Sequence, residues 1–152
     1  MPGSFVDTSA LAKHYHVEPG SAQVDRLWAD FDRTLFISRV GVVEVVSVFA
    51  GKVRGGVLSP SAFVVLRKRF LSDVGQGRPK LVRMLVQHFK DAERLIREHG
   101  LARRLRTLDA LQLAVALDLQ TRGMADLLVA SDQHRLGAAR TEGISVFDPE
   151  NP

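Results

Sequence analysis

The sequence predicts an α/β fold in which a parallel sheet is covered by helices on both faces. Two observations support this prediction. Short, wholly apolar runs are typical of strands buried on both sides, and they alternate along the chain with patterns of helical period. The 152 residues, 45% apolar and 25% charged, have the length and composition of one ordinary globular domain. We therefore expect one domain over residues 1–152, arranged in three α/β/α layers.

Apolar runs predict four strands, at residues 4–6, 35–37, 127–130 and 144–147. A fifth segment, residues 81–87, alternates well enough to be a strand, although a helix remains possible there. All of these segments are short, as expected for strands buried in a parallel sheet.

Helical periodicity links these strands. Helices are expected at about residues 10–15, 19–31, 40–53, 61–73, 88–99, 107–117 and 135–141. Ser38 can cap the third of them, and Gly55 with Gly56 ends it. Gly100 and Gly143 close two later helices in the same way.

The composition excludes several classes of protein. The N-terminal residues lack the basic and apolar regions of a signal peptide, and the most apolar stretch, residues 40–50, is too short to span a bilayer. We therefore expect a cytoplasmic protein without membrane contact. Twenty-one Lys and Arg against 17 Asp and Glu give a net charge of +4, which permits a polyanionic partner without requiring one.

Acidic residues stand where two predicted strands end. Asp7 follows the first strand together with Thr8 and Ser9, and Ser131 with Asp132 follows a later one. Parallel α/β sheets carry their sites at the carboxyl ends of strands, near a switch in strand order, so neighbouring strands would bring both carboxylates to one crevice. Each Asp could instead be a simple helix N-cap.

Two further acids lie at the starts of predicted helices. Glu44 has apolar neighbours on nearly all sides and no cation three or four residues away. An ionised carboxylate there costs several kcal/mol unless it changes protonation or meets a positive charge, although it could also reach solvent past Gly41. Asp109 stands in a first helical turn, where the helix dipole alone favours an acid.

Taken together, the four acids predict a metal site. At a separation of about 5 Å and a dielectric constant near 20, each pair of carboxylates repels by about 3 kcal/mol. Protonation, or one or two divalent cations, would relieve this repulsion, and oxygen ligands on several elements suit Mg²⁺ or Mn²⁺. Such an ion can orient water for attack on a phosphodiester, which fits a chain without Cys or a Gly-x-Ser-x-Gly motif.

Residues 5–13, 38–44, 105–114 and 129–146 carry the motifs of a known family. In these segments, and over nearly the whole chain, the sequence resembles the PIN-domain nucleases, and within them the VapC toxins of bacterial toxin–antitoxin pairs. The resemblance implies a sheet of four or five parallel strands and a Mg²⁺- or Mn²⁺-dependent endoribonuclease that cleaves structured RNA, transfer or ribosomal, by metal-activated water. It also implies a homodimer and a cognate VapB-like antitoxin.

The resemblance also assigns roles to individual residues. By position, the metal-binding and catalytic acids of the family correspond to Asp7, Glu44, Asp109 and Asp132. The accessory hydroxyl positions are matched by Thr8, Ser9 and Ser131. Gln112 stands where many relatives carry His, a departure that removes none of the acids.

Weaker signals and alternatives remain open. Arg103, Arg104 and Arg106 flank Asp109 and could line the path of an RNA substrate, or could simply be solvated. A catalytically silent PIN module that binds RNA or protein, or a housekeeping RNA-processing nuclease, would share the same fold. A phosphoacceptor receiver domain fits poorly, because the first strand carries one Asp and no Lys follows Lys90.

Overall fold

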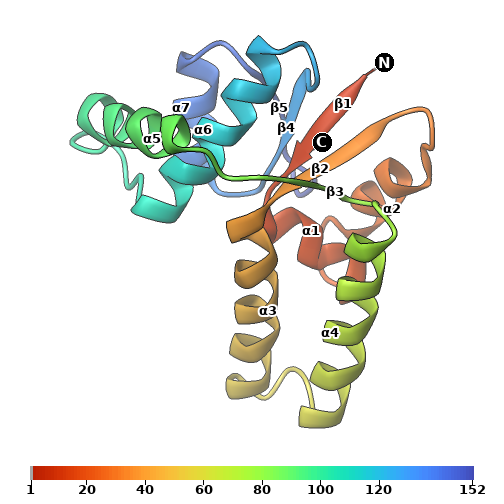
Figure 1. Ribbon diagram of the computed structural model, residues 1–152. Helices are drawn as coiled ribbons and strands as arrows, with labels where there is room; N and C mark the ends of the chain where they lie inside the picture. The colour runs from red at the N-terminus through yellow and green to blue at the C-terminus, as the bar shows by residue number, and fades with distance from the viewer. Residues whose placement is uncertain (1) are drawn as a thin grey trace.

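The computed structural model describes residues 2–152, and within them it has five strands and seven helices (Figure 1). The strands are β1 Gly3–Val6, β2 Thr34–Ser38, β3 Lys80–Val82, β4 Leu127–Val129 and β5 Ser145–Phe147. The helices are α1 Thr8–Tyr15, α2 Ser21–Ala29, α3 Arg39–Arg54, α4 Pro60–Gly75, α5 Val86–His99, α6 Thr107–Thr121 and α7 Gln133–Thr141. All strand pairs are parallel, in the order β3-β2-β1-β4-β5.

The strand order reverses beside β1, which lies at the centre of the sheet. Phe5 of β1 is in register with Phe36 of β2 on one side and with Leu128 of β4 on the other. The Asp7 N–H continues this pairing by donating to the Val129 carbonyl over 2.9 Å. The expectation that the first strand and the strand near residue 128 are neighbours is therefore confirmed, and their carboxyl ends meet at one edge of the sheet.

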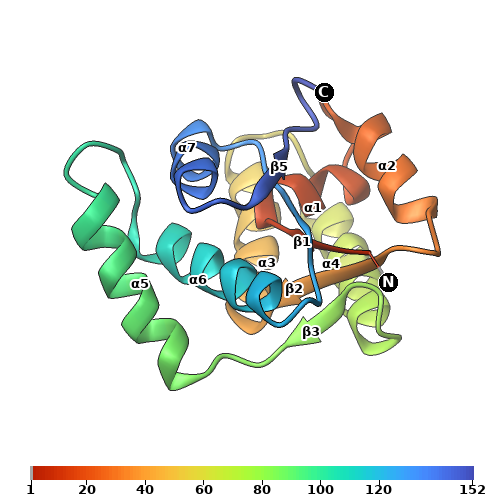
Figure 2. The same ribbon diagram turned by 90° about the horizontal axis from the view of Figure 1, so that it is seen from above.

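The alternation of side chains along each strand divides the core into two apolar clusters. Phe5 and Leu128 face a cluster that includes residues of α5, α6 and α7. The adjacent residues Val6 and Val129 face the opposite cluster, which includes α1, α3 and α4. Figure 2 shows α5, α6 and α7 gathered on one side of the sheet and α1 on the other. This arrangement confirms the three-layer α/β/α fold with five parallel strands.

Helices α3 and α4 form an antiparallel pair that extends away from the carboxyl edge of the sheet (Figure 1). The N-terminus of α3 follows β2 directly, and the Ser38 side chain caps it by accepting from the Gly41 N–H, as the sequence predicts. None of the helices in residues 2–152 combines the length and the apolarity that crossing a membrane requires.

The strand predicted over residues 81–87 is shorter than expected. It occupies Lys80–Val82 as an edge strand, and the chain enters α5 at Val86. The helix begins there because His88 Nδ1 accepts from the Leu85 N–H over 2.9 Å and fixes the first turn. Alternating apolar residues suit both an edge strand and one face of a helix, so the sequence pattern did not locate this boundary.

Candidate active site

The four acids predicted from the sequence lie on four different elements at the carboxyl edge of the sheet. Asp7 follows β1, Glu44 lies in the second turn of α3, Asp109 in the first turn of α6, and Asp132 immediately before α7. Glu44, Asp109 and Asp132 line one hollow of about 500 Å³, and Arg106 also lines it. Asp7 does not line this hollow, because it is buried with an exposed fraction of 1%.

The two aspartates that follow strands use their carboxylates differently. Asp132 is exposed and caps α7, its Oδ1 accepting from the Arg135 N–H over 2.9 Å. Asp7 occupies the N-cap position of α1 but makes no side-chain capping bond. Its Oδ2 instead accepts from the Ser9 hydroxyl over 3.0 Å. Capping therefore accounts for the position of Asp132 but not for that of the Asp7 carboxylate.

Glu44 is held by a chain of hydrogen bonds that crosses the edge of the sheet. Its Oε2 accepts from the Thr8 hydroxyl over 2.8 Å, and Gln112 Nε2 donates to that hydroxyl over 3.2 Å. Gln112 Oε1 in turn accepts from the Ser38 hydroxyl over 2.8 Å. Glu44 is half-buried, and its Oε1 is buried without a hydrogen-bond partner among the described residues. The hydrogen bond to Oε2 thus fixes the carboxylate in place and leaves Oε1 available to a ligand.

The remaining predicted residues lie around these acids. Ser131 is half-buried and lines a neighbouring hollow with Ser9. Arg103 and Arg104 are exposed in the loop between α5 and α6, next to Arg106. The structure therefore brings the predicted hydroxyl and basic residues to the border of the acidic hollow.

Burial, and to a smaller extent like-charge repulsion, disfavours ionisation of two acids of the hollow. Burial raises the pKa of Glu44, and the negative charge of Asp109 raises it further, while hydrogen bonds from Thr8 and Gln112 act in the opposite direction. Burial also raises the pKa of Asp109, and the charge of Asp132 adds to that effect. The folded chain therefore disfavours the fully ionised state of this hollow unless a positive charge compensates it.

Sequence reasoning missed one charged residue of the site, Arg135. It lies in the first turn of α7, is 5% exposed, and places its guanidinium between two acids. Nη1 forms an ion pair with Asp7, and Nη2 donates to Oδ1 of Asp109. Burial lowers the pKa of Arg135 to about 10, which leaves the side chain charged at neutral pH.

A signal for Arg135 was present in the sequence. Leu136, Ala138 and Ala139 are apolar, and the last two stand three and four residues after Arg135, so helical spacing puts Arg135 on the apolar face of the predicted helix. A buried-face arginine needs a carboxylate partner, and this one stands three residues after Asp132. The helix is short, however, and an arginine in it is ordinarily solvated.

The presence of Arg135 agrees with the spacing of the acids. No three of the four carboxylates lie within 4.8 Å of one another in residues 2–152. The guanidinium stands between the carboxylates of Asp7 and Asp109 and keeps them apart. The other acids of the site have no bridging cation, and like charges repel.

Three other residues, Glu98, His99 and Glu142, each place one possible ligand atom within 4.8 Å of the other two. Arg94 bridges the two glutamates, with contacts of 2.8 Å to Glu98 and 2.9 Å to Glu142. His99 Nε2 lies 3.2 Å from the second carboxylate oxygen of Glu142. Arg94 pairs with both glutamates, so we assign the group to an ion-pair cluster between α5 and the end of α7.

The residues of the acidic hollow fit a divalent cation. They offer carboxylate oxygens, the ligands that Mg²⁺ and Mn²⁺ prefer, and the unpartnered Oε1 of Glu44 supplies a free coordination direction. Glu44 and Asp109 would hold such an ion from the hollow. The Arg135 guanidinium pairs with both Asp7 and Asp109, so it would compete with a cation for these two carboxylates.

We predict that Arg135→Met lowers the free energy of unfolding by about 3–5 kcal/mol, because it leaves Asp7 buried without its counter-charge. Mn²⁺ should restore more stability in this variant than it adds to the wild type, since the ion replaces the lost charge. Urea unfolding with Mn²⁺ and with EDTA measures both effects. Arg140→Met, at an exposed position of the same helix, is the matched control. Equal stability of the two variants would contradict the role of Arg135.

Glu44→Gln should stabilise the fold at pH 7 in EDTA. The pKa of Glu44 is raised in the folded chain, so the ionised side chain destabilises the fold. The favourable contribution of neutral Glu44 to the free energy of unfolding is fully present below the pKa of an unfolded Glu, about 4.3, and is lost as pH rises through the folded-state value. The amide of Gln cannot ionise, so the gain should vanish near pH 4. Glu93→Gln is a control of opposite sign, because Arg97 lowers the pKa of Glu93. Unfolding curves at both pH values test this; a Glu44→Gln chain less stable than the wild type at pH 7 would refute it.

Comparison with known proteins identifies the family and the fold. The PIN domain family model matches residues 4–136. No curated protein sequence matches the chain. Among solved structures, VapC20 of Mycobacterium tuberculosis, described as a sarcin–ricin loop cleaving toxin, superposes with a TM-score of 0.66 at 18% identity, covering 93% of this chain and 95% of that one.

Two complexes of similar proteins also match. FitAcB from Neisseria gonorrhoeae gives a TM-score of 0.64 at 17% identity, covering 96% of this chain and 97% of that one. VapBC2 from Rickettsia felis, bound to a DNA fragment from its promoter, gives 0.65 at 14% identity, covering 96% and 98%. At these sequence identities the structural similarity establishes the fold alone. The family is established by the PIN domain family model, which matches most of the sequence. The chain belongs to the PIN-domain family of nucleases.

Proposed function

We propose that this chain is a divalent-cation-dependent endoribonuclease and the toxin of a toxin–antitoxin pair. The observation that supports the catalytic part most directly is the acidic hollow. Glu44, Asp109 and Asp132 come from three separate elements to line it, and Glu44 Oε1 stands there without a partner among the described residues. A cluster of this kind is costly for the fold, which is typical of functional sites.

The proposed reaction is hydrolysis of a phosphodiester by water. When bound, Mg²⁺ or Mn²⁺ would supply Lewis acidity for this chemistry. Two of the predicted hydroxyls are used to hold the acids: the hydroxyl of Thr8 donates to Glu44, and that of Ser9 donates to Asp7. In this arrangement Thr8 and Ser9 orient the carboxylates, while Glu44 and Asp109 would hold the cation.

The substrate we propose is structured RNA, ribosomal or transfer RNA. The support comes from the sequence resemblance to VapC toxins, from VapC20, which is described as a sarcin–ricin loop cleaving toxin, and from the net charge of +4. Arg106 lines the acidic hollow and Arg104 lines the hollow beside it, and both are suited to phosphate contacts.

The proposed partners are a VapB-like antitoxin and a second copy of the chain, in the cytoplasm. The matched FitAcB and VapBC2 structures support a partner of this kind. Helices α3 and α4 carry valines that are largely exposed, with exposed fractions of 68% for Val43, 62% for Val64 and 63% for Val65. Exposed apolar side chains on a helix pair are typical of surfaces that bind another protein.

One observation favours the alternative of a silent PIN module that binds RNA or protein. Arg135 neutralises Asp7 and Asp109 internally, and a site that keeps this arrangement would exclude the cation. Metal-dependent cleavage distinguishes the two functions, because the silent module would bind RNA and cut none.

Asp109→Asn and Glu44→Gln should each reduce RNA cleavage at least about 100-fold, since removing a direct ligand should cost no less than removing a residue that only orients one. Total RNA incubated with Mg²⁺, Mn²⁺ or EDTA provides the assay. Asp32→Asn, an exposed acid away from the hollow, should cleave like the wild type. Full activity of the Asp109→Asn variant, or equal activity in EDTA, would overturn the assignment.

Expression of the wild-type chain alone should slow bacterial growth, because cutting ribosomal or transfer RNA stops translation. Co-expression with the small protein encoded next to it should restore growth. Growth curves with and without this neighbour, with the Glu44→Gln chain as the inactive control, provide the test. Normal growth at high soluble expression would favour the silent module or a housekeeping nuclease.

A further inference from the structure

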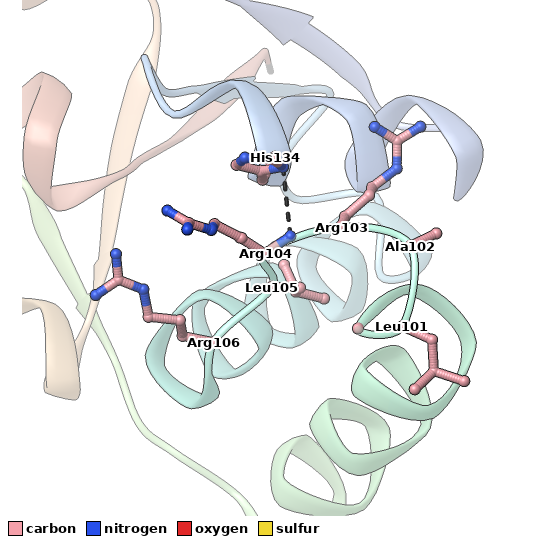
Figure 3. Close-up of a pocket in the computed structure, with 8 residues that line it drawn as sticks. Leu101, Ala102, Arg103, Arg104, Leu105, Arg106 and His134 are labelled. Carbon is pink, nitrogen blue, oxygen red and sulfur yellow. Dashed lines mark hydrogen bonds between the residues drawn. The ribbon is translucent and has the colours of Figure 1, made fainter.

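A second hollow, of about 560 Å³, lies beside the acidic one (Figure 3). It is lined by residues 100–106, which connect α5 to α6, and by His134 of α7. Arg106 lines both hollows, so the two are adjacent. We call the second one the basic hollow, because three exposed arginines, Arg103, Arg104 and Arg106, belong to its lining.

These three arginines have no acidic partner in the described part of the chain. Within residues 2–152 no carboxylate lies within 4.0 Å of their guanidinium groups, whereas Arg94 and Arg97 on the preceding helix are both paired with glutamates. Their charges are therefore available to a ligand.

The three side chains are not equivalent. In Figure 3 the guanidinium groups of Arg104 and Arg106 extend to the same side of the loop, whereas Arg103 points toward α7. A Cβ atom placed on Gly137 of α7 would overlap the Arg103 guanidinium, so Arg103 lies directly against that helix. The loop thus presents two guanidinium groups together and keeps the third apart.

The backbone that carries Arg104 and Arg106 is fixed at three successive residues. The Arg104 N–H donates to His134 Nδ1 over 3.3 Å, and the Arg106 N–H donates to Asp109 Oδ2 over 3.0 Å. Between them the Leu105 side chain is buried in the core, with an exposed fraction of 6%. This anchoring reduces the entropy that the two arginines would lose on binding a ligand.

The charge of the acidic hollow explains why such a pair is useful. Its carboxylates repel any phosphate that approaches, and positive charge close by offsets that repulsion. Arg106 lines both hollows, so its positive charge lies next to these carboxylates. Guanidinium groups also match phosphate geometry, because they donate two parallel hydrogen bonds.

We propose that Arg104 and Arg106 form a subsite for a backbone phosphate of the RNA strand, next to the phosphate that is cut. This proposal rests on the proposed nuclease function and adds to it how the strand is positioned. His134 is a positioning residue, because it holds the Arg104 backbone. Since the contact is to phosphate, it strengthens binding of all sequences alike and does not select among them.

RNA binding without cleavage tests the subsite directly. In a Glu44→Gln background with EDTA, anisotropy of a labelled single-stranded RNA gives the Kd as a function of salt. Arg104→Gln and Arg106→Gln should each weaken binding roughly 5- to 20-fold at low salt, and each should reduce the slope of log Kd against log salt by about 0.7.

Two controls separate geometry from net charge. Arg103→Gln, on the same loop, and Arg67→Gln, on an exposed face of α4, remove the same charge and should weaken binding roughly twofold or less, as expected for a change in net charge alone. If Arg103→Gln and Arg104→Gln weakened RNA binding equally, the change in overall charge would explain the effect, and the proposed subsite would be wrong. No loss in the Arg104→Gln and Arg106→Gln variants would also overturn it.

The role of His134 has its own readout. His134→Ala should weaken RNA binding as much as loss of the Arg104 side chain, whereas His134→Asn should recover most of the affinity, because an amide oxygen at this position can accept from the Arg104 N–H. Loss of affinity in both variants alike would contradict positioning through this hydrogen bond.

Cleavage kinetics distinguish failure of the subsite from failure of the proposed function. Arg104→Gln in the otherwise wild-type chain should raise KM on a long RNA and leave kcat unchanged. A wild-type chain that cuts RNA, together with an unchanged KM in this variant, would refute the subsite and keep the nuclease. A wild-type chain that binds RNA through Arg104 but never cuts would refute the nuclease and keep the subsite.

Discussion

Arg135 places a buried positive charge between two carboxylates that the sheet brings to one edge. The parallel sheet reverses its strand order beside β1, so the residues that follow β1 and β4 meet there. Asp7 is almost fully buried at this point, and its ionised form needs a counter-charge inside the protein. Arg135 supplies it, and it also pairs with Asp109, which lines the acidic hollow.

The same interaction connects stability with activity. The Arg135 guanidinium stabilises Asp7 and Asp109 in the folded chain when no metal is bound. It also occupies carboxylate oxygens that a metal ion would need. Glu44 is held independently, through Thr8 and Gln112, and so keeps a free oxygen whatever Arg135 does. Glu44 therefore offers a divalent ion an oxygen that no other group of the described residues occupies, whereas Asp7 and Asp109 both pair with Arg135.

Much of this architecture could be predicted from the sequence, because the physics involved is local. Wholly apolar runs marked the buried strands, and Glu44 was conspicuous as an unpaired acid in an apolar helix. Arg135 was missed because its partners Asp7 and Asp109 are far from it in sequence and meet it only in three dimensions. The strand at β3 was overextended because alternation does not distinguish an edge strand from a helix start. The different directions of Arg103 and Arg104 likewise depend on how the loop packs against α7.

Acidic and basic hollows that share Arg106 form one continuous surface, suited to a ligand that carries repeated negative charge. The central claim is that the acidic hollow binds a divalent cation. A crystal of the wild-type chain soaked in Mn²⁺, with anomalous scattering measured near the manganese edge, tests it most directly. If the hollow binds the cation, an anomalous peak should lie in it, about 2.1 Å from carboxylate oxygens of Glu44 and Asp109. A crystal without manganese in this hollow, or with manganese only at Glu98, His99 and Glu142, would contradict it.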